Sequence, residues 1–315
     1  MPNSLTSDQL KWLNSLAQAT RAQDKAEDLD KKWEDLTATE AQRLYDSSGN
    51  LNMKVLTDFR REEVFVSDQG PYTDFVSLLP KHWWRKWLTS PIKGSIKWLK
   101  ERTIGSYRGN RRSIEASFQR LKYAGGLPLL KKHPVEGTPG NPYFINKHGY
   151  SYNNRWLRHI HFATLFEKHL GEEVRKRGDF VIMDIGCSYS IYASIIKKEF
   201  PNTKFILVDF PEQLLLSAYF LANQFPEAKF SCLPEVENLT SIDRGHTDQF
   251  DFTLVPVNLF HKISGGTVDM VTNFFSFGEM RREWFTQYIE SSSFKQADFL
   301  QTCNRFESAP GYEPT

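Results

Sequence analysis

Long hydrophobic runs and cysteine are what this chain of 315 residues has least of. The longest nearly apolar stretch is residues 214–222, which contains a serine, whereas a membrane-spanning helix needs about 18 or more apolar residues. Three cysteines (Cys187, Cys232 and Cys303) are too few and too scattered for a disulfide framework or a zinc cluster. Residues 1–8 lack the basic start and apolar core of a signal peptide. We therefore expect a cytoplasmic protein that does not cross a membrane.

The excess of charge of one sign is also small, since the formal net charge is +2, but the charged residues are unevenly spread. Residues 81–112 contain ten Lys or Arg and a single acid, Glu101, so the remainder of the chain is acidic. A nucleic-acid-binding protein is usually basic throughout, so we expect no nucleic-acid partner. Trp83, Trp84 and Trp87 share one face of a predicted helix. Such a basic helix can make peripheral contact with an anionic membrane, while packing of the Trp face inside the protein is the simpler alternative.

The first half of the chain is predicted to be mainly helical. Thr6 and Gln9 match the reciprocal capping pattern of a helix start. Residues 51–132 continue as helices interrupted at glycine and proline, including a break at the Gly-Gly pair before residue 127. Residues 133–151 are rich in Gly, Pro, Asn and His and are predicted to form a loop. We assign residues 1–150 to an N-terminal region that covers the site or recognises the substrate.

The second half alternates between short apolar runs and longer amphipathic stretches. Helices are predicted over 153–170, 190–200 and 212–224, and strands over 180–184, 204–209, 228–233, 250–255, 268–272 and 299–303. Strands that alternate with helices imply a parallel sheet with helices on both faces. Residues 151–315 are therefore predicted to be an α/β domain with a Rossmann-like sheet.

Small and acidic residues follow the first two predicted strands, where open parallel sheets bind their ligands. Residues 184–190 read Asp-Ile-Gly-Cys-Ser-Tyr-Ser, and Asp209 ends the second strand. Small residues in such a turn let backbone N–H groups approach a ligand closely. An acid at the tip of the second strand can accept hydrogen bonds from both ribose hydroxyls of an adenosine.

Two cofactors use this layout. A dinucleotide fingerprint has glycines where this chain has Gly186, Ser188 and Ile191, and an isoleucine at the third position obstructs close helix–strand packing. The acid two residues before Gly186 resembles instead the S-adenosylmethionine motif Asp-x-Gly-x-Gly-x-Gly, with Ser188 and Ser190 in place of two glycines. S-adenosyl-L-methionine is the expected cofactor, and an NAD-dependent oxidoreductase is the less favoured alternative.

Two later motifs narrow this resemblance to a family. Residues 208–212 (Val-Asp-Phe-Pro-Glu) and 273–280 (Asn-Phe-Phe-Ser-Phe-Gly-Glu-Met) resemble the sugar O-methyltransferases, whose fold is similar to that of class I S-adenosylmethionine-dependent methyltransferases. Residues 140–142, 154–158 and 303–306 fit the same pattern. The resemblance covers about half of the chain. It implies methyl transfer to a hydroxyl of a sugar or glycan acceptor, which is a glycoside, a nucleotide-sugar or a surface polysaccharide.

The resemblance also implies roles for individual residues. The cofactor would contact Asp184, Gly186, Cys187, Ser188, Asp209, Phe210, Pro256 and Val257, with Cys187 as a small filler. Among the candidate catalytic residues, Glu279 is the first choice as base, although a glutamate at a helix start is also favoured by the helix dipole. Asn273 lies beside it, and His261 is a second candidate base. Ser276 and Arg158 are candidate substrate contacts, and no ligand spacing predicts a metal.

The end of the chain departs from the fold of this family. The class I sheet normally ends in an antiparallel hairpin after its fifth strand, whereas this sequence stops about a dozen residues after residue 303. We expect the hairpin to be absent or truncated, which exposes one edge of the sheet. A catalytically inactive binding or scaffold protein with the same fold is therefore the main alternative function.

Overall fold

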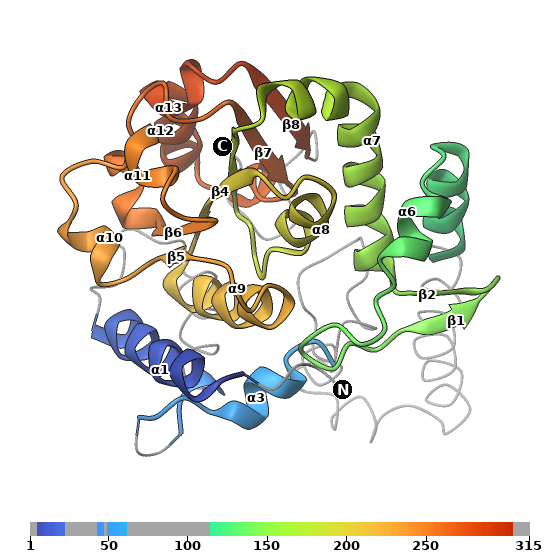
Figure 1. Cartoon of the computed structure of the whole chain (residues 1–315), viewed down its shortest axis with the longest axis horizontal. Helices are drawn as coiled ribbons and strands as arrows, with labels where there is room; N and C mark the ends of the chain where they lie inside the picture. Colours follow the sequence, from blue (N-terminus) through green and yellow to red (C-terminus); the bar gives the residue numbers. More distant parts are fainter. Residues whose placement is uncertain (1–4, 23–42, 47–48, 62–113, 305–315) are drawn as a thin grey trace, which may run out of the picture. The chain divides into compact units, whose positions relative to one another are not determined.

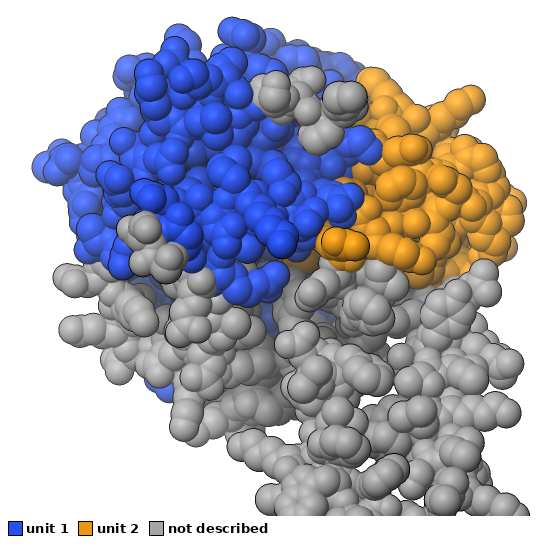
Figure 2. All heavy atoms as spheres, turned by 90° about the horizontal axis from the view of Figure 1, so that it is seen from below, with its two compact units in different colours: residues 1–59, 137–141, 165–315 blue, residues 60–136, 142–164 orange. Residues whose placement is uncertain are grey.

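A computed structural model describes residues 5–22, 43–46, 49–61 and 114–304 (Figure 1). The chain divides into two compact units, which Figure 2 colours separately. Unit 1 comprises residues 1–59, 137–141 and 165–315, and unit 2 comprises residues 60–136 and 142–164. The predicted boundary after residue 150 does not coincide with this division, because the first 59 residues cluster with the sheet.

Unit 1 is built on a six-stranded parallel sheet flanked by helices (Figure 1). In chain order its strands are β3 (Phe180–Ile185), β4 (Thr203–Asp209), β5 (Phe230–Ser231), β6 (Phe252–Pro256), β7 (Met270–Phe274) and β8 (Phe299–Cys303). They are hydrogen-bonded in the order β5-β6-β4-β3-β7-β8. All six predicted strands and the α/β class are confirmed, because short runs that are buried on both faces form the centre of a parallel sheet.

The three helices predicted for the second half are also present. They are α7 (Asn154–Arg177), α8 (Ile191–Glu199) and α9 (Pro211–Gln224), of which α7 extends past its predicted end at residue 170. Phe166 on α7 packs against Phe180, Tyr192 and Phe200, with its ring centroid 5.3 Å from that of Phe200. The remaining elements after β5 are α10 (Glu235–Asn238), α11 (Arg244–Thr247), η2 (Val257–Lys262), η3 (Phe277–Glu279), α12 (Arg282–Glu290) and α13 (Ser292–Lys295).

The N-terminal helix α1 (Ser7–Ala22) begins where its capping pattern predicts. The backbone N–H of Thr6 donates to Oε1 of Gln9 at 2.9 Å, and that of Gln9 donates to Oγ1 of Thr6 at 3.2 Å. The helix lies along α9 (Figure 1) and buries Leu13 and Leu16. A short helix, α3 (Met53–Asp58), completes this part of unit 1.

Unit 2 corrects the predicted loop over residues 133–151. Within it, β1 (Ile145–Lys147) and β2 (Tyr150–Tyr152) form an antiparallel hairpin. Its two turn residues, His148 and Gly149, have φ angles of +56° and +79°, which is the backbone of a tight two-residue hairpin turn. The His-Gly pair that reads as loop composition is therefore the turn of a hairpin. The predicted break before α6 (Leu127–Lys132) is present, because the preceding helix ends at residue 123.

Some predictions concern segments that the structure does not describe. The basic, Trp-rich segment 81–112 lies outside the described residues, so its contact with a membrane stays a prediction. Residues 305–315 also lie outside them, and the absence of a terminal hairpin stays a prediction too. In the part of the chain that is described, no helix combines the length and apolarity that crossing a bilayer requires.

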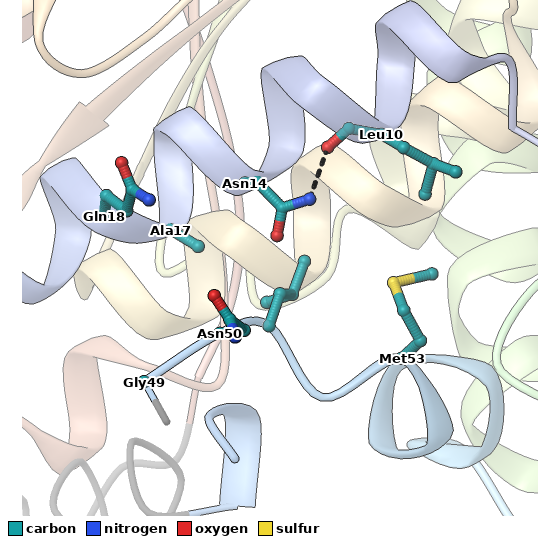
Figure 3. Close-up of a pocket in the computed structure, with 8 residues that line it drawn as sticks. Leu10, Asn14, Ala17, Gln18, Gly49, Asn50 and Met53 are labelled. Carbon is teal, nitrogen blue, oxygen red and sulfur yellow. Dashed lines mark hydrogen bonds between the residues drawn. The ribbon is translucent and has the colours of Figure 1, made fainter. Parts of the chain in front are cut away.

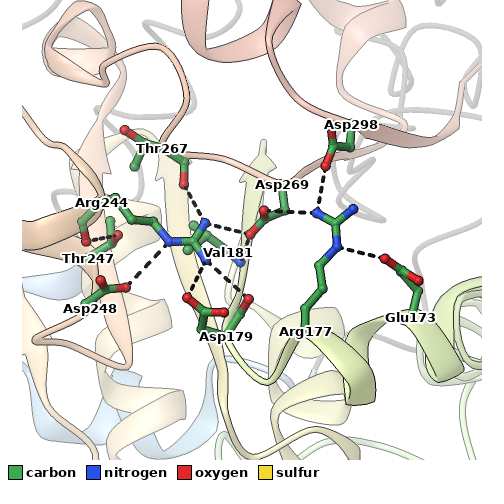
Figure 4. A network of polar contacts seen from close by, with 10 residues as sticks. All are labelled: Glu173, Arg177, Asp179, Val181, Arg244, Thr247, Asp248, Thr267, Asp269 and Asp298. Carbon is green, nitrogen blue, oxygen red and sulfur yellow. Dashed lines mark hydrogen bonds and ion pairs between the residues drawn. The ribbon is translucent and has the colours of Figure 1, made fainter.

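Ion pairs connect the amino ends of the central strands (Figure 4). Asp269, which directly precedes β7, accepts from Nη1 of Arg244 and from the backbone N–H of Val181, each at 2.7 Å. Arg177 at the end of α7 lies 3.4 Å from Asp269 and donates to Asp298 at 2.7 Å. This network fixes the edge of the sheet opposite to the one where a ligand is expected.

Candidate functional site

The order of the strands locates the place where a ligand is expected. β4, β6 and β5 lie on one side of β3, whereas β7 and β8 lie on the other. Open parallel sheets bind ligands outside the carboxyl ends of their strands, where the strand order reverses. The segments at this place, which we call the carboxyl edge, are 186–190 after β3, 209–210 at β4, 256–260 at β6 and 273–279 at β7.

The loop after β3 keeps the backbone of a glycine-rich turn although it contains a single glycine. Gly186, Ser188 and Ser190 have φ angles of +73°, +51° and +64°. The two serines are those that replace glycines of the S-adenosylmethionine motif, and both adopt the left-handed conformation that glycine adopts without strain. The hydroxyl of Ser190 lies 2.5 Å from that of Ser217 on α9. The loop therefore has three residues with left-handed backbone, of which one is glycine.

This left-handed backbone gives a first testable prediction. Replacing Ser188 by glycine should raise the free energy of unfolding by about 0.5–1 kcal/mol. The left-handed conformation costs a residue with a Cβ about 1–2 kcal/mol, and the greater entropy that glycine loses on folding offsets part of this gain. Urea unfolding measures the change. The control is Ser188→Ala, which removes the hydroxyl but keeps the strain, so equal stabilities of the two variants would contradict the prediction.

Asp209 supports this loop from the end of β4. One carboxylate oxygen accepts from the backbone N–H of Ser188 at 2.6 Å, and the other accepts from that of Phe210 at 2.8 Å. The side chain is buried, with 9% of its surface exposed. Asp209 therefore joins the loop after β3 to the end of β4.

Asp184 is more deeply buried and is held by the neighbouring strand. It is 3% exposed, and its Oδ1 accepts from the hydroxyl of Thr272, its partner in the register of β3 and β7, at 2.7 Å. Burial raises the pKa of Asp184 to about 7; the Thr272 hydrogen bond lowers it, and the charge of Asp209 raises it further. A carboxyl with such a pKa at the ligand edge of a sheet is a candidate functional group.

All the hydrogen-bonding positions of the Asn273 side chain are used by other groups of the protein. Its Nδ2 donates to the carbonyl of Ile185 at 2.8 Å and to Oγ of Ser276 at 2.5 Å. Its Oδ1 accepts from the backbone N–H of Phe277 at 3.1 Å and from Nδ2 of Asn304 at 2.9 Å. With its surface entirely buried, Asn273 positions the turn after β7 and offers no group to a substrate.

Ser276 lies directly over Gly186. A Cβ atom on Gly186 would overlap the Ser276 side chain, whose hydroxyl lies 3.3 Å from the carbonyl of Ile185. Glycine at 186 is therefore required by packing as well as by its φ angle. The predicted residues of β3 and β7 thus do come together, but Ser276 contacts the loop backbone.

Asn304, just beyond β8, belongs to the same edge, although the sequence assigns it no role. Its Nδ2 donates to Asn273 and, at 2.5 Å, to Oγ1 of Thr302. Its Oδ1 is buried and has no hydrogen-bond partner among the described residues. A buried acceptor without a donor costs about 1–3 kcal/mol, so a ligand donor would be favoured there.

The two candidate bases lie in different surroundings. Glu279 ends η3, directly after the Ser276 turn, where its backbone N–H donates to the Ser276 carbonyl at 3.0 Å, and its side chain is half-buried. His261 lies in η2 with an exposed side chain, and its Nδ1 is 3.0 Å from the Asn258 carbonyl. No hydrogen bond joins His261 to another predicted site residue of the described chain. Glu279 is therefore the better placed of the two.

The adenine side of the predicted site is apolar. Pro256 is buried at the end of β6, in register with Asp209, and Val257 follows it half-buried at the start of η2. Burial, together with the charges of Asp209 and Asp184, raises the pKa of the Cys187 thiol, which agrees with its interpretation as a filler rather than a nucleophile. Tyr288, which the sequence does not single out, packs its ring against that of Phe260 in η2.

Arg158 lies in unit 2, so its surroundings are described within that unit. It is on the same α-helix, α7, as Arg155 and His159. Burial lowers the pKa of His159 well below its ordinary value, and Arg155, Arg158 and Arg60 lower it further. Arg158 and two other arginines therefore act on the same buried histidine.

A pocket of about 320 Å³ lies elsewhere in unit 1, between α1 and residues 49–53 (Figure 3). Leu10, Ala17 and Met53 provide apolar lining, and Asn14 turns its amide back to the Leu10 carbonyl at 2.9 Å. None of the predicted site residues lines it. Among the described residues, no group of three or more His, Cys, Asp or Glu is arranged to hold a metal ion.

Comparison with known proteins names no relative. The chain matches no protein-family model and no curated protein. The function therefore has to be argued from the carboxyl edge itself.

Proposed function

We propose that the protein is an S-adenosylmethionine-dependent O-methyltransferase that acts on a hydroxyl of a sugar or glycan. The observation that carries the proposal is the loop after β3. It has the left-handed backbone of a glycine-rich turn at three positions, and its Ser188 N–H is bound by Asp209 from the next strand. This combination stands where the strand order reverses.

The chemistry of the edge fits this cofactor. S-adenosylmethionine supplies a methyl group on a positively charged sulfur, together with an ammonium group and two ribose hydroxyls. The edge offers negative charge and acceptors to match, namely Asp184, Asp209 and the unpaired Oδ1 of Asn304. The pyrophosphate of NAD would meet two carboxylates instead. Ile191 is also buried at the first position of α8, where the dinucleotide fingerprint requires a glycine.

In the proposal, each residue of the carboxyl edge would contact a different part of the cofactor. Asp209 would accept hydrogen bonds from the ribose hydroxyls, and Phe210 and Val257 would line the adenine. Gly186 and Ser188 present backbone to the methionine part, whose ammonium group is attracted by Asp184. Asn273 and Ser276 hold the turn that carries Glu279, as their hydrogen bonds indicate.

The acceptor hydroxyl needs a base because it is a weak nucleophile at neutral pH. In the proposal, the Glu279 carboxylate would take the hydroxyl proton while the oxygen bonds to the methyl carbon and the bond from that carbon to sulfur breaks, so that S-adenosylhomocysteine would leave as a neutral thioether. Such a base typically contributes about 10²–10⁴-fold to the rate. Alignment of the attacking oxygen with the methyl group and sulfur would supply much of the remainder. The sugar class comes from the resemblance of residues 208–212 and 273–280 to sugar O-methyltransferases.

Calorimetry tests the proposal most directly. The full chain is titrated with S-adenosylmethionine, S-adenosylhomocysteine and NAD, and methyl transfer is then assayed on a panel of sugars. Micromolar binding of the first two, with none of NAD, is the expected result. A folded protein that binds none of them would leave the scaffold alternative, and binding of NAD alone would leave the oxidoreductase.

The raised pKa of Asp184 makes cofactor binding depend on pH. The carboxyl is protonated below its pKa of about 7 and ionised above it, and a cation binds the ionised form better. Affinity for S-adenosylmethionine should therefore rise about tenfold between about pH 6 and pH 8. Since the folded state holds this proton more tightly than the unfolded state, stability of the free protein falls as pH rises through the same carboxyl's range, from about 4 to 7.

Asp184→Asn provides the matched control for the pH dependence. Asparagine keeps an acceptor for the Thr272 hydroxyl but cannot ionise, so its affinity should be lower and nearly independent of pH. A wild-type affinity that stays constant over this range would contradict the prediction.

A further inference from the structure

One serine interrupts the longest nearly apolar run of the sequence. Residues 214–222 form most of α9, and the serine among them, Ser217, is fully buried. Buried hydroxyls in proteins nearly always have a hydrogen-bond partner. Ser217 has its partner outside α9, because its Oγ lies 2.5 Å from that of Ser190, which stands 27 positions earlier in the chain. This serine therefore joins α9 to the loop after β3.

Ser190 occupies a position that suits glycine better. It ends the loop after β3 as the N-cap of α8, with a φ of +64° and a ψ of +40°. A residue with a Cβ is disfavoured in this left-handed conformation, which glycine adopts without strain. A serine at an N-cap usually accepts from a backbone N–H of its own helix, but the Ser190 side chain makes no such bond in α8, all of which the structure describes. Its buried hydroxyl meets Ser217 instead.

The two ends of this loop are held by different elements. At its start, the backbone N–H groups of Gly186 and Cys187 donate to the Val208 carbonyl of β4 at 2.8 and 3.4 Å. At its end, the Ser190 N–H donates to the Cys187 carbonyl at 2.9 Å, which closes the turn. The bond between the two hydroxyls then ties Ser190 to Ser217 on α9. The loop is thus held by β4 on one side and by α9 on the other.

We infer that Ser217 is a positioning residue for the cofactor, which acts through Ser190 to hold the loop after β3 in the conformation that binds. The inference rests on the proposed function, in which the backbone of this loop contacts the methionine part. A glycine at position 190 would adopt the left-handed backbone unaided. Here the bond between the two hydroxyls offsets the strain that serine introduces, and the loop keeps its conformation without that glycine.

The substitution Ser217→Ala tests this role, because it removes one oxygen and alanine suits a helix interior. It leaves the Ser190 hydroxyl buried without its partner and the left-handed backbone unsupported, so the loop would spend part of its time in other conformations. Affinity scales with the fraction of molecules whose loop is competent to bind. Affinity for S-adenosylhomocysteine, measured by calorimetry, should fall about fivefold or more, as expected for one unpaired buried hydroxyl.

The matched control is Ser194→Ala on α8. The Ser194 hydroxyl is equally buried, but it donates at 2.8 Å to the carbonyl of Ile191 in its own helix. The loss of this bond removes a buried hydroxyl close to the loop without releasing the loop. Ser194→Ala should therefore bind S-adenosylhomocysteine as tightly as wild type.

Glycine at position 190 should restore binding. The double variant Ser190→Gly/Ser217→Ala has neither a strained Cβ nor an unpaired hydroxyl at the end of the loop, so its affinity should return to within about twofold of wild type. A role of Ser217 in the packing of α9 alone predicts no such rescue. Ser190→Ala makes the same test without a change in α9. It keeps the Cβ but loses the bond, so it should bind more weakly than Ser190→Gly.

Three results would overturn the inference while the proposed function stands. They are an unchanged affinity in Ser217→Ala, an equal loss in Ser194→Ala, and a double variant that binds no better than Ser217→Ala. If Ser217→Ala does not fold, the comparison of Ser190→Ala with Ser190→Gly decides, and equal affinities of these two overturn the inference. If wild type binds no adenosine compound, the proposed function itself fails, and the inference fails with it.

Discussion

Replacing Asp209 by asparagine should weaken the binding of S-adenosylhomocysteine about 100-fold or more. The carboxylate is the proposed acceptor for both ribose hydroxyls, and a hydrogen bond to a charged group contributes about 1.5–3 kcal/mol. The backbone N–H groups of Ser188 and Phe210 both donate to the carboxylate. Asparagine has a single acceptor oxygen, so its N–H₂ group would face one of these two donors. The loss combines a missing charge with a loosened loop, and titration calorimetry measures it.

A matched control separates binding from folding in this experiment. Asp269→Asn makes the same change in the same sheet but at the amino edge, where Asp269 binds Arg244 and Val181 instead of a ligand. This variant should be less stable in urea yet keep wild-type affinity. If Asp209→Asn binds as tightly as wild type, or if both variants lose affinity to the same extent, Asp209 is not the ribose acceptor.

Much of the fold can be predicted from the sequence, because the signal for a buried parallel strand is local. The run over residues 180–184 became β3, and the run over 299–303 became β8 without any shift in its ends. The acid at the end of β4 is also a local feature, since it interrupts an apolar run where a strand must stop. These predictions need no knowledge of how the strands are ordered.

The rest depends on contacts between distant segments, which periodicity does not encode. Tyr288 contacts Phe260 only because the chain crosses from β6 to β7, on the other side of β3, before it forms α12. The unpaired Oδ1 of Asn304 arises from its bonds to Asn273 and Thr302, one of which spans 31 positions. Composition predicts a loop at the β1–β2 hairpin, because the His-Gly pair of its turn is typical of loops.

Asn273 illustrates a different limit of sequence reasoning. An amide next to the proposed methyl-transfer position has the right chemistry for a catalytic contact, and the pattern alone favours that role. In the structure all four of its hydrogen-bonding positions are taken by the loops it joins. Its contribution is therefore to fix the turn that leads to Glu279, and residue type alone cannot separate these two roles.

Replacing Asp269 by alanine should lower the free energy of unfolding by about 2–4 kcal/mol. Asp269 is mostly buried, with 16% of its side chain exposed, and it accepts from Arg244 and Val181 at 2.7 Å each (Figure 4). Removing one partner of a buried ion pair costs about 3–5 kcal/mol, and the partial exposure of Arg244 reduces that figure. Urea denaturation of the two proteins measures the difference.

Asp298→Ala is the control for this prediction. Asp298 also pairs with Arg177, at 2.7 Å, but 53% of its side chain is exposed. Exposed ion pairs contribute about 0–1 kcal/mol, so this variant should be nearly as stable as wild type. If both substitutions cost the same, burial does not control the strength of the network. If Asp269→Ala instead lowers cofactor affinity without lowering stability, the two edges of the sheet are coupled, and the assignment of a structural edge opposite a ligand edge fails.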